Sequence, residues 1–285
     1  MHKIADGVYF ENSYFSGNVG FVMTAEGAVL IDTPMLPKDA WDWLKKITSV
    51  CKRGIAALIN TDYHIEHILG NCFFPAAITI AHQTTWAELQ RYDEAYLQRY
   101  ISHVKHHYPA VEADLSKVRI VWPELTLTAD MTLYQGEQVF DLVYAGGHTP
   151  ASILVRLPKS RVLFAGAVVV TNEHPSLGQA TSERWLQTLE MIRGMEDVDI
   201  VVPGYGEPCA RADTQTLSDY ITALRDRVYE YYSSGYTRRE TVDKVRMADF
   251  YSMPPSRRPE IERRIRSSVE RVYDEFKKGT EKKRR

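Results

Sequence analysis

One amphipathic segment lies between two short apolar runs in the first quarter of the chain. Residues 28–31 and 55–60 are apolar and of strand length, and residues 37–47 between them have helical periodicity with a proline at the start. A strand, a helix and a second strand in this order form a β-α-β crossover. The pattern therefore predicts an α/β fold.

The same alternation continues along the rest of the chain. We expect further strands at 7–10, 20–23, 76–80, 119–122, 131–134, 139–144, 152–156, 162–164 and 199–202. Helical periodicity marks residues 83–107, 182–195, 214–233, 238–245 and 259–278. A chain of 285 residues, of which 44% are hydrophobic, is long enough for one large α/β domain with additions.

Polar side chains crowd the loop that follows the apolar run 55–60. Asp62, His64, Glu66 and His67 lie within six residues of the sequence. Alternate residues of an extended strand end point the same way, so the first three could converge on one centre while His67 turns toward a neighbouring one. Such a cluster is typical of a metal site, and the alternative is a polar loop that contains a helix cap.

Four segments resemble the motifs of one known family. Residues 62–67 resemble a His-x-His-x-Asp-His motif, with an aspartate for the first histidine and a glutamate for the aspartate. Residues 145–152 resemble Gly-His-Thr-x-Gly/Ala-Ser, 163–167 resemble Leu-Phe-x-Gly-Asp, and 202–206 resemble Pro-Gly-His-Gly. This is the pattern of the metallo-β-lactamase superfamily. The resemblance implies a four-layer αββα sandwich with a metal site.

The resemblance further implies that Asp62, His64 and His148 bind one metal. Two imidazoles and one carboxylate form a complete set of three ligands, with positions left open for water or substrate. We expect a divalent metal ion, with zinc as the first choice. The same ligand set resembles that of non-haem iron enzymes and would also suit manganese.

A second metal lacks part of its ligand set. The family's places for these ligands hold Glu66, His67, Ala167 and Tyr205. Ala167 has no donor atom, so the carboxylate that would bridge two metals is absent. The phenol of Tyr205, with an ordinary pKa of about 10, loses its proton only if a metal compels it. We therefore expect one metal rather than two.

The implied activity is that of a metal-dependent hydrolase acting on an ester, thioester, lactone or lactam bond. The metal would lower the pKa of a bound water from about 15.7 to roughly 7 and so supply hydroxide at physiological pH. Glu66 would act as general base or as a second-metal ligand, and Tyr205 would donate a hydrogen bond to the developing oxyanion. Two alternatives stay open: a mononuclear non-haem iron enzyme that carries out oxidation, and a non-catalytic binding protein with a degraded metal site.

The expected organisation is one main domain with two helical additions. Residues 1–210 would form the metallo-β-lactamase-like domain, and an insertion at about 83–110 would roof its cleft. Residues 211–285 would form a C-terminal helical extension that packs on the sandwich or joins two copies in a homo-oligomer. A proline-rich break at 253–259 precedes its last helix.

Other acidic and histidine residues have expected places outside the ligand set. Asp32 ends a strand and would contact a metal ligand at most. His174 would either line the cleft or make a structural hydrogen bond. Three histidines share one face of a helix and are expected at the surface, outside the site, namely His103, His106 and His107.

Charge and composition limit the partners. The net charge of −2 gives no electrostatic reason to bind nucleic acid, and the basic residues of 281–285 predict a solvated tail. No apolar run approaches the roughly 20 residues that span a bilayer, so we expect a small-molecule substrate and no membrane contact. Three cysteines without Cys-x-x-Cys spacing predict a cytoplasmic protein, or a periplasmic one if a leader was trimmed.

Overall fold

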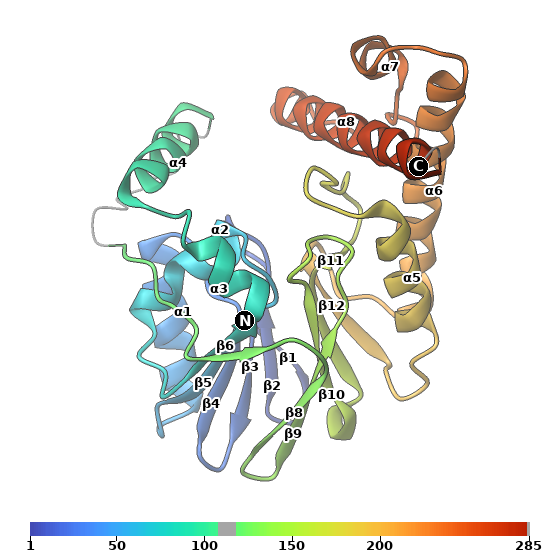
Figure 1. Cartoon of the computed structure of the whole chain (residues 1–285). Helices are drawn as coiled ribbons and strands as arrows, with labels where there is room; N and C mark the ends of the chain where they lie inside the picture. Colours follow the sequence, from blue (N-terminus) through green and yellow to red (C-terminus); the bar gives the residue numbers. More distant parts are fainter. Residues whose placement is uncertain (108–117, 284–285) are drawn as a thin grey trace.

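The computed structural model describes residues 1–107 and 118–283, which form two β-sheets with helices outside them (Figure 1). The first sheet has the strand order β1-β2-β3-β4-β5-β6-β7, antiparallel up to β4 and parallel from there on. Its strands are β1 (His2–Ala5), β2 (Val8–Glu11), β3 (Val19–Thr24), β4 (Gly27–Ile31), β5 (Ile55–Ile59), β6 (Thr79–His82) and β7 (Leu125–Leu127).

The second sheet has the order β12-β11-β10-β9-β8, in which only the β11–β12 pair is parallel. Its strands are β8 (Met131–Gln135), β9 (Gln138–Tyr144), β10 (Ile153–Leu157), β11 (Val162–Val170) and β12 (Ile200–Tyr205). The α-helices are α1 (Pro37–Val50), α2 (Ile65–Ile68), α3 (Gln83–Leu89), α4 (Glu94–His107), α5 (Ser182–Arg193), α6 (Gln215–Ser233), α7 (Arg238–Lys244) and α8 (Arg258–Lys283). Short 3₁₀ turns are η1 (Leu69–Phe73), η2 (Pro158–Ser160) and η3 (Arg211–Thr214).

An apolar core joins the inner faces of the two sheets. All nine residues of β11 are buried, and alternate side chains point to opposite faces. Phe164 therefore packs between the sheets, whereas its neighbours Leu163 and Ala165 pack against the outer helices. Gly20 of β3 makes room for this ring, because a Cβ at that position would lie 2.2 Å from a ring atom of Phe164.

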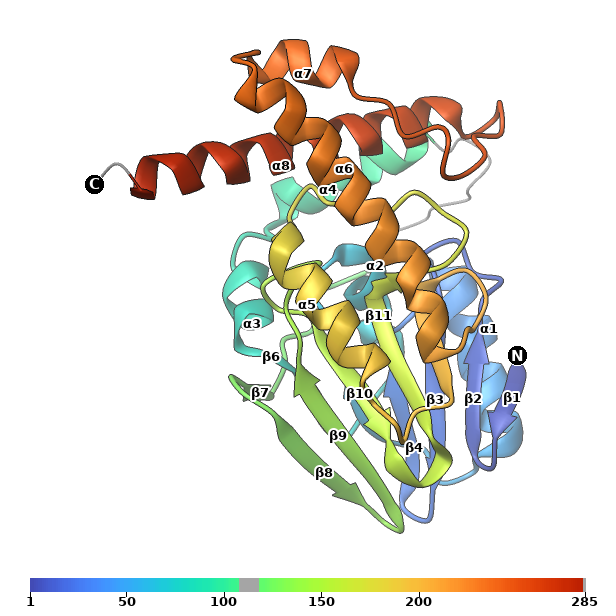
Figure 2. The ribbon, with the colours of Figure 1, turned by 90° about the vertical axis from the view of Figure 1, so that its right-hand side faces the viewer.

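Helices cover both outer faces of the sandwich (Figure 2). On the first sheet, the buried Trp43 and Ile47 of α1 pack against Phe21, Leu30 and Leu58. On the second sheet, α5 and α6 bury their apolar faces against β11 and β12. Two helical layers around two sheets confirm the predicted αββα arrangement.

The helical addition after β6 differs from the single stretch predicted at 83–107. Helix α3 ends at Leu89, and α4 begins after Asp93, whose carboxylate accepts a hydrogen bond of 2.7 Å from the backbone nitrogen of Tyr96. The strand predicted at 119–122 does not form, because β7 occupies the place beside β6 and Ile120 packs toward α4 instead. Residues 108–110 of the expected insertion lie outside the described residues.

The C-terminal helices share a core with the second sheet. One continuous cluster of buried side chains includes Leu163 and Val201 of the strands together with Ile221 of α6 and Val269 of α8. His174 belongs to this packing, since its ring nitrogens lie 3.0 Å from the Tyr220 hydroxyl and 3.1 Å from a backbone oxygen. Of the two expected roles of His174, lining the cleft or making a structural hydrogen bond, these contacts match the second.

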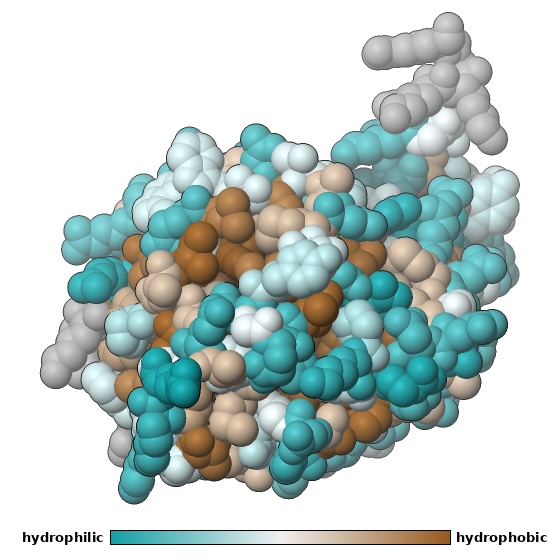
Figure 3. Space-filling model, turned by 90° about the horizontal axis from the view of Figure 1, so that it is seen from below, coloured by the Kyte–Doolittle hydropathy of each residue, from teal (hydrophilic) through white to brown (hydrophobic). Residues whose placement is uncertain are grey.

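Among the described residues, no helix combines the length and the apolar composition that crossing a bilayer requires. The view from below, opposite α4 and α8, shows hydrophilic residues around the rim with hydrophobic atoms between them (Figure 3). Helix α8 runs to Lys283 and so extends into the tail predicted at 281–285.

Candidate metal centre

Three side chains from the two sheets converge at one point. Asp62 and His64 follow β5, and His148 lies in the loop between β9 and β10. Nδ1 of His64 is 3.1 Å from Nε2 of His148 and 3.3 Å from Oδ2 of Asp62, and the remaining pair is 3.7 Å apart. A backbone hydrogen bond of 2.9 Å from Ile153 to Thr61 ties the two loops together.

These donor atoms fit a single metal ion. Zinc in a tetrahedral site, with bonds of about 2.0–2.1 Å, has neighbouring ligand atoms roughly 3.3 Å apart, close to the spacing found here. The side chains of Asp62 and His148 are buried, whereas 24% of the His64 side chain is exposed. Asp62, His64 and His148 therefore offer three donor atoms to a metal, and the His64 side of this cluster is open to solvent.

The charges of the three groups are coupled. Burial alone would raise the pKa of Asp62, but the charges of His64, His67 and His148 hold it well below its ordinary value. Burial and the charge of His64 lower the pKa of His148 to about 3. An ionised carboxylate and a neutral imidazole are the forms in which these groups bind metal.

The surrounding structure fixes His148. The ring of Trp185 in α5 lies against it, with ring centres 5.0 Å apart, and the indole nitrogen donates a hydrogen bond of 2.7 Å to the Val168 carbonyl. Gly147 allows this close packing, since its φ is +92° and a Cβ there would lie 2.7 Å from the Trp185 backbone.

His67 lies apart from this group. Its Nδ1 is 3.1 Å from Oδ2 of Asp32, a carboxylate that also accepts hydrogen bonds from the backbone and hydroxyl of Thr61. Burial opposes ionisation of His67, but the charges of Asp32 and Asp62 raise its pKa to about 10. The other ring nitrogen, Nε2, is buried and has no partner among the described residues. Asp32 thus contacts His67, one of the residues predicted to bind metal.

Glu66 does not converge with Asp62 and His64 as the extended-strand argument predicted. Helix α2 begins at Ile65, so Glu66 is turned away from that line and accepts a hydrogen bond of 2.9 Å from the Tyr100 hydroxyl. Tyr100 belongs to α4, in the insertion expected to roof the cleft. No sequence signal linked it to Glu66, because the two residues are 34 positions apart.

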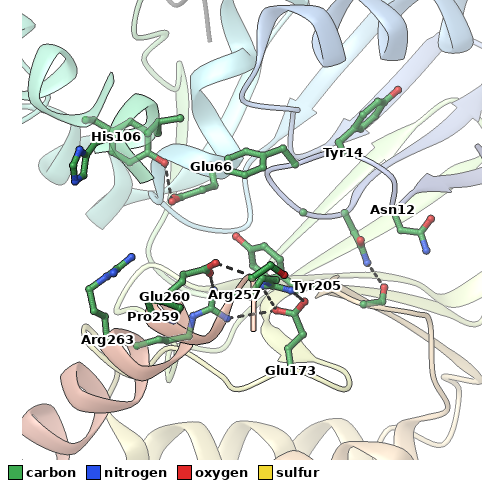
Figure 4. A pocket seen from close by; sticks show the side chains of 18 residues that line it. Asn12, Tyr14, Glu66, His106, Glu173, Tyr205, Arg257, Pro259, Glu260 and Arg263 are labelled. Carbon is green, nitrogen blue, oxygen red and sulfur yellow. Dashed lines mark hydrogen bonds and ion pairs between the residues drawn. The ribbon is translucent and has the colours of Figure 1, made fainter. Parts of the chain in front are cut away.

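A cavity of about 730 Å³ opens beside Glu66 (Figure 4). Tyr205, at the end of β12, lines the same cavity, and its ring lies against His67 with centres 6.1 Å apart. Burial and the charges of Glu66 and Asp62 raise the pKa of Tyr205. Ala167, buried in β11, brings no donor atom to this region. His106 is exposed on α4, as expected, and also lines the cavity.

Comparison with known proteins identifies the family. The model of the metallo-beta-lactamase superfamily matches residues 13–205. The chain belongs to this superfamily. It is 26% identical over 211 residues to the metallo-beta-lactamase type 2 of Bacillus cereus, which covers 70% of this chain and 73% of the relative. Superfamily members depend on metal, usually zinc.

Two solved structures share the fold over nearly the whole chain. A metallo-beta-lactamase family protein from Thermus thermophilus superimposes with a TM-score of 0.67 and 16% identity, covering 96% of this chain and 95% of its own. A sec-alkylsulfatase from Pseudomonas sp. gives a TM-score of 0.75 at 14% identity, covering 96% of this chain and 49% of its own. At such identities the likeness shows the fold alone.

Proposed function

We propose that this superfamily member is a metal-dependent hydrolase that cleaves an ester, thioester, lactone or lactam bond. One observation carries the proposal: three donor atoms of Asp62, His64 and His148 lie within 4.8 Å of one another, and a cavity begins at Glu66, two residues after His64. A metal site next to a space of ligand size is what hydrolysis by an activated water requires.

The residues around the cavity suit the remaining steps. Asp62, His64 and His148 would hold a divalent metal, which would supply Lewis acidity and lower the pKa of water from about 15.7 to about 7. Glu66, whose Oε1 is held by Tyr100, would accept the proton of the attacking water. The Tyr205 hydroxyl has no hydrogen-bond partner within the described residues and a raised pKa, so it would donate a hydrogen bond to the developing oxyanion.

One zinc ion rather than two is the proposed content of the centre. His67 offers a buried Nε2 without a partner within the described chain, which is a suitable second-site donor. Ala167 cannot bridge, and the protonated phenol of Tyr205 replaces an imidazole. A second ion would therefore rest on His67 and Glu66 alone, which is short of the three protein ligands that catalytic zinc sites have.

Two other functions are supported by specific observations. Two imidazoles and one carboxylate are also the ligand set of non-haem iron oxygenases, which supports an oxidative enzyme at the same three residues. Ala167 supports the second candidate, a binding protein that kept the fold without catalysis, because it removes a donor at a family metal position. Metal identity and content separate the three candidates.

The first experiment measures bound metal by mass spectrometry on protein purified without added metal. It compares the wild-type chain with a His64→Ala, His148→Ala double variant and with His2→Ala, an exposed histidine on β1, as the matched control. We expect about one equivalent of zinc in wild type and control and none in the double variant. Zinc at 100 times its dissociation constant should also raise the free energy of unfolding by about 2.7 kcal/mol in the first two only.

The activity arm uses chromogenic esters, thioesters, lactones and a β-lactam with the zinc-loaded protein. Turnover that disappears in the double variant supports the hydrolase. One equivalent of iron instead of zinc would redirect the assays to oxygen consumption. A chain that refuses every metal on titration would refute both enzymes and leave the binding protein.

A further inference from the structure

The cavity beside Glu66 lies between the sandwich and the two helical additions. Tyr100 and Val104 of α4 line one side, and Arg263 and Arg264 of α8 line the other. In Figure 4 the side chains of both helices face the same space. Its volume of about 730 Å³ lies within the usual range of small-molecule sites, about 300–1,000 Å³. A substrate portion beyond the reacting bond therefore has room between α4 and α8.

Most charged groups on the α8 side are paired with one another. Glu173 lies 2.9 Å from Arg257 and 3.5 Å from Arg264. Glu260 lies 2.7 Å from Arg264 and 3.6 Å from Arg257. Two carboxylates thus neutralise two guanidinium groups, and these four side chains have no net charge left for a ligand.

Arg263 is the exception on this wall. It lies three residues after Glu260, on the same helix face, and lines the cavity as an exposed side chain. Within the described part of the chain it has neither an ion pair nor a side-chain hydrogen bond. Its positive charge is therefore available inside a cavity, where the planar guanidinium can hold a carboxylate through two parallel hydrogen bonds.

The cavity has groups of opposite charge in its lining, Glu66 near the candidate metal centre and Arg263 on α8. Glu66 repels an anion near the candidate metal centre, while Arg263 attracts one on the α8 wall. We propose that the substrate carries a carboxylate that binds Arg263 while its scissile bond lies toward Glu66 and Tyr205. Arg263 is then a specificity-determining residue. This inference rests on the proposed hydrolase function and names its substrate class.

The kinetic test compares two esters of equal length on the zinc-loaded protein. They are the mono-4-nitrophenyl ester of glutaric acid, which has a free carboxylate, and its neutral methyl ester. An ion pair strengthens binding a few-fold at an exposed site, and tenfold or more where it forms charge-assisted hydrogen bonds. Arg263→Gln should lower kcat/KM for the acid about tenfold, through KM, and leave the neutral ester unchanged. Arg263→Lys should restore part of the loss.

Arg258→Gln is the matched control, since this exposed arginine of the same helix does not line the cavity. An equal effect of Arg263→Gln on both esters would overturn the inference, and so would an equal loss in the control.

A binding test does not depend on catalysis. Calorimetry on the full chain after removal of metal compares 5-phenylvalerate with its neutral amide. Metal removal keeps the carboxylate from binding at Asp62, His64 and His148. Tighter binding of the acid that Arg263→Gln abolishes supports the inference even if neither ester is hydrolysed, in which case only the hydrolase proposal fails. Equal binding of acid and amide overturns the anion site itself.

Discussion

Replacement of Trp185 by phenylalanine tests how much the packing of α5 beside His148 contributes to the stability of the fold. The Trp185 side chain is fully buried, its ring packs on His148, and its indole nitrogen donates a hydrogen bond of 2.7 Å to Val168. Phenylalanine keeps a ring at this position but removes the donor. A buried carbonyl that loses its partner costs about 1–3 kcal/mol. The smaller ring also leaves about 40 Å³ empty, which adds about 1 kcal/mol.

We therefore expect Trp185→Phe to lower the free energy of unfolding by about 2–4 kcal/mol, a large share of the roughly 5–15 kcal/mol typical of folded proteins. Urea unfolding of the metal-free chain, followed by circular dichroism, measures the change as a shift of the midpoint at unchanged slope. Trp41→Phe is the control, because 58% of Trp41 is exposed and its replacement should cost less than about 0.5 kcal/mol. A loss below about 1 kcal/mol for Trp185→Phe would show that the hydrogen bond and the packing contribute little.

Three further changes test other contacts. Tyr100→Phe removes the hydroxyl that donates to Glu66, so kcat for ester hydrolysis should fall about tenfold with little change in KM; unchanged steady-state kinetics would contradict this role. Gly166→Ala should lower the free energy of unfolding by about 1–3 kcal/mol in a urea titration, because φ is +51° and the added methyl would lie 2.3 Å from a side-chain oxygen. Burial would raise the pKa of Glu11, but hydrogen bonds, first that from Lys46, lower it from 4.5 to about 2. Its contribution to stability is therefore complete above pH 4.5 and is lost as the pH falls toward 2. Lys46→Met should raise this pKa and move acid unfolding, followed by circular dichroism, to higher pH, and an unmoved midpoint would count against the ion pair.

Most strands were predictable because they carry their own apolar signal, whereas the largely exposed edge strands β1 and β7 were not predicted. The crossover from β4 through α1 to β5 follows the sequence closely, since a buried strand and an amphipathic helix each have a distinct periodicity. The strand predicted at residues 119–122 does not form, for a different reason. An apolar run shows that a segment is partly buried, and whether it packs on a sheet or on a helix depends on distant partners such as α4.

In the candidate site, too, the positions of some residues were predictable from the sequence and those of others were not. The motif positions predicted the convergence of Asp62, His64 and His148, because strand ends and a short hairpin loop fix their positions. Glu66 was misplaced since one helical residue turns a side chain by about 100°, and the sequence did not show that α2 begins at Ile65. Tyr100 reaches the site only through the docking of α4, which depends on contacts far away in the sequence.

The candidate metal centre and the cavity both depend on assembly of the whole molecule. Asp62 and His64 follow β5 of the first sheet, and His148 lies in the loop between β9 and β10 of the second; the hydrogen bond from Ile153 to Thr61 joins the two. Either sheet alone carries at most two of the three donors. Metal binding at the proposed site would therefore require the packed sandwich, and its free energy would add to the stability of that packing. The cavity depends in addition on α4 and α8, since Tyr100 and Val104 of the first helix and Arg263 and Arg264 of the second line it.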